Sequence, residues 1–448
     1  MAQVHAKNAV ASVPTRPGAS GSGRADGVRP ERGCQSDGTA AREPVRVMFV
    51  QDHLGQSLGS IHGVTRYLLS TLPAFDRRVI EPSLCILSPR HIVGERLLGA
   101  EGIRPVFLGR PKWDPRALAG LVRLVRERDI DVLHLGGFKA IMLGRMAARI
   151  TGRAAVLHLH DARPMPALVR LVQHRLAAWT DATIVVSAAM RQVALADYGL
   201  PAERLEVLHN GVRSEAITSI APGERGRVRV ELGLSPDAPV IGIVGRIEAG
   251  KGLEPLLRAM PEVLARCPRA TLLVVGDGPM RPACERLAGD LGVSASVRFT
   301  GYRADIPAVL SAMDVMAAPA LAEEGLGYAV LEGMCAGLPI VACPSGGLTE
   351  VVRHGETGLL VPKGEVAPLA AGLIDLLTDV RKRQAFSGAA RRRVAEFSIE
   401  GHVARLQEIH QAVARLRSRR PAGARRLFPK ATRRLRGRPI GQGGEHNA

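Results

Sequence analysis

Short, wholly apolar runs alternate along the chain with longer stretches in which apolar residues recur every three or four positions. The first run, Val45 to Val50, leads through a Gly-punctuated loop into a helical pattern around Val64 to Leu72. Each run is long enough for one buried strand, and each periodic stretch for one covering helix. The later runs of this half are Ser83 to Leu87, Asp131 to Leu135, Ala154 to His160 and Ala182 to Ser187.

The alternation starts again at Val240, so the chain consists of two similar halves. Strands connected through helices predict a parallel sheet in each half. The length of 448 residues also exceeds what one hydrophobic core usually supports. We therefore expect an α/β fold with two Rossmann-like domains. The later strands are expected at Val240 to Val244, Thr271 to Val275, Ser296 to Thr300, Asp314 to Ala317 and Pro339 to Ala342, with helices at Leu253 to Arg266, Arg281 to Leu291, from about Gly327, and at Ile399 to Arg415.

Composition suggests where the structured part begins and ends. The first 43 residues are rich in turn formers and poor in apolar residues, which predicts a disordered leader. Ser214 to Pro239 is charged, contains Gly and Pro and lacks a clear core stripe, so we expect the interdomain linker there. The predicted organisation is a leader (1–43), an N-terminal domain (44–213), a C-terminal domain (214–398), a helix returning to the first domain (399–415) and a basic disordered tail (416–448).

Overall composition is that of a globular, reduced protein. Hydrophobic residues make up 46% of the chain and charged residues 23%, which excludes a wholly disordered protein. The six cysteines form no C-x-x-C pair and lie beside no histidine at zinc-finger spacing, which indicates a cytoplasmic chain. No apolar stretch has the length of a signal peptide or of a membrane span.

The formal net charge of +19 is unevenly distributed. Arg415 to Arg438 contains eleven Arg or Lys residues and no acid, so one short tail supplies most of the excess. Two interpretations stay open: a solvated terminus, or attraction to anionic lipid headgroups or polyphosphate, which would associate the protein with a membrane. A nucleic-acid role is disfavoured, because Phe428 is the only aromatic residue near the tail and offers no stacking platform.

Two glutamates, Glu324 and Glu332, flank the start of a predicted helix. A Gly-containing loop precedes this helix, so its first amides, near Gly327, Tyr328 and Ala329, point at whatever binds there. Carboxylates only accept hydrogen bonds, so each glutamate can hold a pair of sugar hydroxyls. The alternative is a solvated face, but Glu332 lies in an apolar helix that leads into a buried strand, which favours a binding site.

The segment Gly245 to Gly252 follows a strand and precedes a helix, as a nucleotide-triphosphatase P-loop does. A P-loop requires Ser or Thr after its lysine to bind Mg²⁺, whereas Gly252 follows Lys251 here. The segment is therefore not a P-loop. Its cations, Arg246 and Lys251, belong either to a solvated surface loop or to a phosphate site.

Together these motifs resemble the family-four retaining glycosyltransferases of the GT-B fold. That family's signature is Glu, seven residues, Glu, then Ala-Gly-x-Pro-x-Val, and the chain has it from Glu324 to Val341. The resemblance spans about residues 44–415. It implies two Rossmann-like domains facing across a cleft and a C-terminal helix that crosses back to the first domain. In the family, the first glutamate contacts the donor sugar, the second binds the ribose, and the two cations neutralise the leaving nucleotide diphosphate; these roles would fall on Glu324, Glu332, Arg246 and Lys251.

The strand-end segment His158 to Asp161 also has a counterpart in the family. A zinc-hydrolase pattern would need Asp and His at the next two positions, where the chain has Ala162 and Arg163, so no metal site is predicted. The family's His-Asp would give His160 a place near the donor sugar and its phosphate, while His158 is interpreted as a core histidine. Asp129 and Asp131 imitate an Asp-x-Asp metal motif but are interpreted as a strand start.

Glycine-bearing loops complete the predicted binding residues. The resemblance places Gly63 beside the donor phosphates, although only one glycine of the usual pair is kept. It places Gly278 and Gly301 in loops that border the nucleotide base. Ordinary strand-end turns remain an alternative for both loops.

The resemblance implies a metal-independent, retaining transferase that needs no cofactor beyond its nucleotide-diphosphate sugar. The N-terminal domain would then bind the acceptor, a sugar or lipid-linked glycan used in envelope polysaccharide or glycolipid synthesis. One alternative is a sugar-nucleotide epimerase or hydrolase of the same fold. Another is a basic lipid- or nucleic-acid-binding protein with an inactive site.

Overall fold

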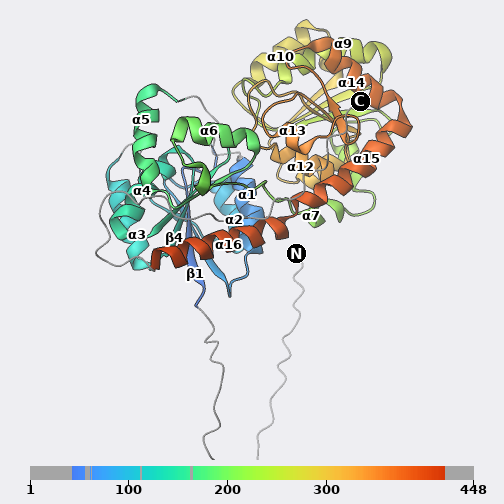
Figure 1. The fold of residues 1–448 in the computed structure, drawn as a ribbon. Coiled ribbons are helices and arrows are strands. Elements are labelled where there is room, and N and C mark those ends of the chain that lie inside the picture. Colours follow the sequence, from blue (N-terminus) through green and yellow to red (C-terminus); the bar gives the residue numbers. More distant parts are fainter. Residues whose placement is uncertain (1–42, 56–60, 62, 111–113, 162–164, 419–448) are drawn as a thin grey trace, which may run out of the picture. The chain divides into compact units, whose positions relative to one another are not determined.

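The computed structural model describes residues 43–55, 61, 63–110, 114–161 and 165–418. The predicted leader up to Arg42 and the basic tail from Arg419 lie outside these residues. The described elements form two parallel sheets, of seven and six strands, with helices linking successive strands (Figure 1). This arrangement confirms the α/β class and the two wound halves; the domain boundaries themselves stay a prediction.

The first sheet has the strand order β3-β2-β1-β4-β5-β6-β7. Two of its central strands, β4 and β5, are buried along their whole length. Such strands are covered on both faces, which explains why the sequence shows apolar runs rather than alternation. The strands are β1 (Val45–Gln51), β2 (Ile80–Ile86), β3 (Val106–Phe107), β4 (Val132–Gly136), β5 (Ala154–Leu159), β6 (Ala182–Val185) and β7 (Leu205–Val207). The helices are α1 (Gly63–Thr71), α2 (Ile92–Ala100), α3 (Arg116–Glu127), α4 (Phe138–Thr151), α5 (Ala167–Leu176) and α6 (Ala188–Tyr198).

The second sheet repeats the plan with the order β10-β9-β8-β11-β12-β13. Its strands are β8 (Val240–Val244), β9 (Thr271–Val275), β10 (Val297–Gly301), β11 (Val315–Ala318), β12 (Ile340–Ala342) and β13 (Gly358–Leu360). Its helices are α9 (Leu253–Arg266), α10 (Arg281–Asp290), α11 (Ile306–Ser311), α12 (Tyr328–Cys335), α13 (Leu348–Val351), α14 (Val366–Thr378) and α15 (Val380–Val394). The predicted strands at Val240 and Thr271 are confirmed to the residue.

Helix α16 (Ile399–Ser418) packs against the first sheet, although it follows the second sheet in the chain (Figure 1). Its apolar residues share one core cluster with those of β1 and β2. Where the chain crosses between the sheets, the Val212 amide donates to the Phe397 carbonyl at 2.8 Å, so the two crossings run side by side. The predicted returning helix is thereby confirmed.

The helix continues beyond Arg415, where we expected it to end before a disordered tail at residue 416. Arg417 donates to the Arg153 carbonyl at 3.0 Å and lies 3.6 Å from the Asp181 carboxylate. These contacts hold the last turn on the first domain, so the predicted start of the tail was wrong. Of the helices that the structure describes, none combines the length and apolar character needed to span a bilayer.

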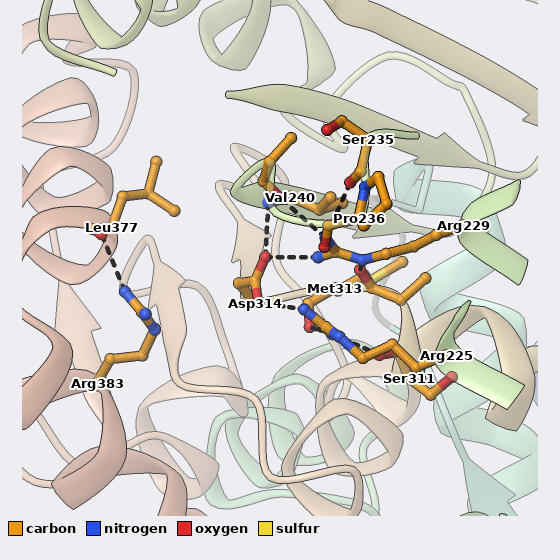
Figure 2. Close-up of polar contacts among 12 residues, drawn as sticks. Arg225, Arg229, Ser235, Pro236, Val240, Ser311, Met313, Asp314, Leu377 and Arg383 are labelled. Carbon is orange, nitrogen blue, oxygen red and sulfur yellow. Dashed lines mark hydrogen bonds and ion pairs between the residues drawn. The ribbon is translucent and has the colours of Figure 1, made fainter. Parts of the chain in front are cut away.

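The segment from Ser214 to Pro239 was expected to be the interdomain linker and to lack a core stripe; the linker assignment stays a prediction, but the segment is helical in part and contributes buried residues such as Val228. It contains α7 (Glu215–Thr218) and α8 (Glu224–Glu231). Figure 2 shows Arg225 and Arg229 of α8 reaching Asp314, which precedes β11, at 2.7 and 2.9 Å. Arg229 also donates to backbone carbonyls of Ala312, Ser235, Pro236 and Ala238. The sequence could not show this, because the partners are distant along the chain.

A cavity of about 270 Å³ adjoins this cluster at the amino-terminal edge of the second sheet. Its arginines are engaged by the protein itself. Arg383, for example, donates to the carbonyl of Leu377 at 2.9 Å (Figure 2) and to that of Leu376 at the same distance. Guanidinium groups used in this way satisfy helix-end carbonyls. We therefore assign the cluster a structural role.

Candidate active site

The predicted site residues follow the carboxyl ends of strands, the edge where parallel sheets bind ligands. Arg246 and Lys251 lie in the loop after β8, Glu324 lies in the loop after β11, and His160 follows β5 of the first sheet. Gly278 follows β9, and Gly301 is the last residue of β10. The topology therefore collects five of these predicted residues on one edge of the second sheet.

Glycine at position 325 brings the Glu324 loop against His160. A β-carbon at Gly325 would lie 1.9 Å from the His160 carbonyl oxygen, a distance that no side chain tolerates. The loop is held on its other side by a 2.9 Å hydrogen bond from the Gly347 amide to the Glu324 carbonyl. The Glu324 loop and the backbone of His160, far apart in sequence, are thus neighbours, while the His160 ring packs against Tyr67 and His158.

Lys251 and Glu324 form an ion pair, with 2.5 Å between Nζ and Oε1. The lysine side chain is 36% exposed and the glutamate side chain 19%, so the pair faces solvent in part. Arg246 pairs with Glu248 at 2.9 Å. Lys251, predicted to hold phosphate, and Glu324, predicted to hold sugar, therefore meet.

Glycines let the surrounding loops approach within backbone contact. A β-carbon at Gly252 would lie 1.9 Å from the Pro319 carbonyl oxygen, and φ is +81° there. The hydroxyl residue of a P-loop could not occupy this position, which explains the glycine. A β-carbon at Gly278 would lie 2.3 Å from the Ile247 carbonyl oxygen, and Gly301 accepts from the Gly276 amide at 2.9 Å.

The amino end of α12 is set by Gly327, the N-cap residue, with φ at +84°. The first amides of a helix, here those of Tyr328 and Ala329, have no acceptor inside the helix and favour an anion. The Tyr328 side chain points elsewhere: its hydroxyl donates to Ser70 Oγ in α1 at 2.8 Å. Only its backbone can therefore serve the predicted site.

Glu332 lies one helical turn further on and is almost completely buried. Its Oε1 accepts from the Arg66 guanidinium at 2.8 Å, and its side chain is 8% exposed. Burial raises the pKa of Glu332 above its usual range, and the nearby Arg66 offsets part of that rise. Arg66 was absent from the predicted site, because nothing in the sequence links α1 to α12.

Gly63 begins α1 and lies toward Glu332 rather than Gly327. Arg66, in the first turn of α1, contacts Glu332, whereas Ser70, one turn later, contacts Tyr328, one turn earlier in α12. The two helices thus pack antiparallel to each other. A shared phosphate contact of Gly63 and the start of α12 stays a prediction.

Glu350 makes a further contact that sequence reasoning missed. Its carboxylate accepts from the Ala188 amide at 2.9 Å and from His209 Nε2 at 2.8 Å, so it caps the start of α6. Burial pushes the pKa of Glu350 up, but these hydrogen bonds outweigh it and hold the pKa below its usual range. The contact joins α13 to the carboxyl edge of the first sheet.

A chain of buried histidines underlies His160. His158, interpreted as a core histidine, is fully buried, and its ring centroid lies 4.0 Å from that of His160. His134 bridges His158 and His410 through ring-nitrogen distances of 3.0 and 2.9 Å. Tyr67 continues the chain, with its hydroxyl 3.4 Å from His158 Nδ1 and 3.2 Å from His402 Nε2. The network links the end of β5 to α16.

Asp129 and Asp131 lie at the opposite edge of the first sheet, before β4. Both pair with Arg46 and Arg153, which lie at the same edge, at the starts of β1 and β5. Their carboxylates therefore neutralise arginines at the strand start, as the sequence interpretation expected, and lie away from the strand ends that carry His160.

Two family models match the chain. Residues 61–216 match the model described as Glycosyltransferase Family 4, and residues 238–379 match the model described as Glycosyl transferases group 1. The GDP-mannose-dependent alpha-(1-6)-phosphatidylinositol monomannoside mannosyltransferase of Mycolicibacterium smegmatis is 34% identical over 290 residues, which cover 62% of this chain and 75% of that protein. The 2-deoxystreptamine glucosyltransferase of Streptomyces kanamyceticus is also 34% identical, over 60% of this chain and 73% of that protein.

Solved structures show the same architecture. The Anabaena protein HepE, in complex with UDP-glucose, is 25% identical, with a TM-score of 0.72 over 82% of this chain and 99% of its own. WaaG, a glycosyltransferase involved in lipopolysaccharide biosynthesis, is 18% identical, with a TM-score of 0.62 over 81% of this chain and 99% of its own. The two sheets thus have the arrangement of a GT-B fold, as the sequence motifs implied.

Proposed function

Because the chain belongs to the glycosyltransferases of group 1 and family 4, we propose that it moves a sugar from a nucleotide diphosphate to an acceptor hydroxyl with retention of configuration. The observation that carries the proposal is the contact of the Glu324 loop with both Lys251 and His160. It supports one centre in which phosphate, sugar and acceptor groups meet.

Leaving-group stabilisation is the main task of this centre. Arg246, Lys251 and the first amides of α12 would neutralise the diphosphate as the bond from sugar C1 to the phosphate oxygen breaks. Preorganised charge of this kind usually supplies the largest part of catalysis. Such a set of cations and amides supports a reaction that needs no metal ion.

Retention follows if the acceptor oxygen attacks C1 on the face that the diphosphate leaves. The acceptor proton would then pass to the departing phosphate oxygen, so no protein base is required. Glu324 and His160 would orient the sugar, and Glu332 would hold the ribose. Neither glutamate acts as a general base in this scheme.

The donor and acceptor classes are inferred from relatives. Proteins of equal identity to this chain are named for GDP-mannose-dependent mannosyl transfer to phosphatidylinositol monomannoside and for glucosyl transfer to 2-deoxystreptamine. We propose a hexosyl donor, with GDP-mannose the first to test, and a glycolipid acceptor of the cell envelope.

A glycolipid acceptor requires contact with a bilayer, and α5 supports such contact. Leu168 and Leu171 are 72% and 54% exposed on this helix, and Arg170 and Arg175 lie beside them. Exposed apolar residues flanked by arginines suit an anionic membrane surface. We propose a peripheral enzyme that works from the cytoplasmic side, with the basic tail as a second contact.

Thermal shift with a panel of nucleotide diphosphates and their sugars tests the donor proposal. Binding at 100 times Kd would stabilise the protein by about 2.7 kcal/mol. We expect one nucleotide series to stabilise the chain and Lys251→Ala to abolish the shift. Stabilisation by none of them would contradict the proposed function. Donor consumed without acceptor would favour an epimerase or hydrolase instead.

The remaining alternative, a basic binding protein with an inactive site, makes the opposite prediction for two variants. Truncation after Ser418, where α16 ends, would abolish its function while Glu332→Ala would not. We expect Glu332→Ala to abolish transfer in solution, and the truncation to reduce only activity on vesicle-bound acceptor.

A further inference from the structure

The carboxylate of Glu332 is held in an unusual way for a buried acid. One oxygen, Oε1, accepts from Arg66 at 2.8 Å, while the other, Oε2, is buried and has no hydrogen-bond partner among the described residues. A buried acceptor without a donor is costly and rare in native structures. The arrangement therefore calls for a donor that comes from a ligand.

Arg66 cannot easily move away from this carboxylate, because α1 is fixed against α12 at a second point. Ser70, one turn along α1, accepts from the Tyr328 hydroxyl at 2.8 Å, one turn before Glu332. The Arg66 side chain is only 24% exposed. The two contacts determine both the position of Arg66 and the rotation of the carboxylate that it holds.

A carboxylate fixed through one oxygen presents the other in a single direction. We propose that Arg66 is a positioning residue that fixes the Glu332 carboxylate so that Oε2 accepts a hydrogen bond from one ribose hydroxyl of the donor nucleotide. This inference rests on the proposed function, since it needs a ribose beside α12. A consequence of the proposal is that the site binds one of the two ribose hydroxyls, 2′ or 3′, more strongly than the other.

Arg66 also favours the charged form of the carboxylate. Burial raises the pKa of Glu332, and the charge and hydrogen bond of Arg66 offset part of that rise. A protonated acid would be a weaker acceptor at the buried oxygen. A hydrogen bond to a charged group is about twice as strong as one between neutral groups, so both effects of Arg66 act in the same direction.

Isothermal titration of the full-length chain with parent, 2′-deoxy and 3′-deoxy nucleoside diphosphates tests the proposal. Both guanosine and uridine diphosphates are titrated. The deoxy forms are then compared in the series whose parent nucleotide binds with the lower Kd. In the wild type, we expect one deoxy form to bind about 10- to 100-fold more weakly, as for a lost hydrogen bond to a charged group. The other deoxy form should bind within about 3-fold of the parent.

Variants separate positioning from general damage. In Arg66→Gln, the parent nucleotide should bind as weakly as the weaker deoxy form binds the wild type. The ratio of the Kd values of that deoxy form and the parent should then fall below about 3-fold. Arg66→Lys should recover part of the ratio, since it restores the charge without the fixed geometry. Ser70→Ala, which breaks only the second contact, should keep most of the ratio. Urea unfolding of each variant checks that the chain is folded.

Two results would overturn the role of Arg66. One is a wild type that treats both deoxy forms alike. The other is Arg66→Gln with a weakened parent but an unchanged ratio, which would mean that Arg66 contacts the phosphates instead. If no parent nucleotide binds the wild type, the proposed function fails as well, so the two failures are distinguishable.

Discussion

The buried histidine network predicts a steep loss of stability in mild acid. Burial lowers the pKa of His402 to about 4 and that of His410 to about 3, against a usual value of 6.5. These rings stay neutral in the folded protein at pH values where the unfolded chain protonates them. The unfolded state then binds more protons, so stability is complete above about pH 6.5 and falls as the pH drops towards 4.

The magnitude follows from those values. Between pH 8 and pH 5, each of the two histidines should cost about 2 kcal/mol in the free energy of unfolding. His134 and His158, whose pKa values burial also lowers well below the usual value, act in the same direction. In His410→Phe, one titrating ring is removed, and the fall between pH 8 and pH 5 should be about 2 kcal/mol smaller than in the wild type.

Urea unfolding at several pH values, followed by tryptophan fluorescence, measures this difference. Both tryptophans, Trp113 and Trp179, precede the second domain in the sequence, so the signal reports the first domain. His410→Phe should be less stable at pH 8 by about 1 to 3 kcal/mol, because His134 loses its partner. His174→Gln, at an exposed position, is the control. Parallel pH curves for the wild type and His410→Phe would refute the reasoning.

Three further variants test the site and the fold. Gly325→Ala should reduce kcat/KM by about 100-fold or more in a steady-state transfer assay while the chain stays folded, because its methyl group would displace His160. The control is Gly99→Ala, whose methyl group meets no neighbour and which should leave kcat/KM unchanged. Arg229→Met should destabilise the second domain by about 3 to 5 kcal/mol in thermal unfolding, since it leaves buried partners without a donor; a change under about 1 kcal/mol would contradict the structural role of this cluster. Lys251→Ala should lower kcat by about 100-fold or more, whereas EDTA should leave the wild-type rate unchanged; a rate that EDTA abolishes would refute metal independence.

Sequence patterns predicted the strands that are buried on both faces. The apolar runs at Val240 and Thr271 match β8 and β9 to the residue, because a strand covered on both sides is built mainly from apolar residues. Short edge strands such as Val106–Phe107 carry too few residues for any period to appear. Helix α8 was missed for another reason: its mean character is polar, and what holds it is arginine bound to distant carbonyls.

For the site, local motifs predicted residues but could not predict their partners. The spacing of Glu324 and Glu332 and the loop from Arg246 to Lys251 are visible in the chain, and so is the strand end at His160. Which residue would neutralise Glu332 is not visible, because Arg66 reaches it only through the packing of α1 on α12. A carboxylate in an apolar helix was the one signal that some cation had to be near.

Transfer of labelled mannose from GDP-[1-¹³C]mannose to a phosphatidylinositol mannoside, followed by NMR of the glycolipid, tests the central claim most directly. We predict that one labelled residue appears in the glycolipid per GDP released, that its anomeric carbon keeps the α configuration of the donor, and that Glu332→Ala abolishes the signal. A β-linked product would contradict retention, and GDP release without labelled glycolipid would contradict the proposed transfer to this acceptor.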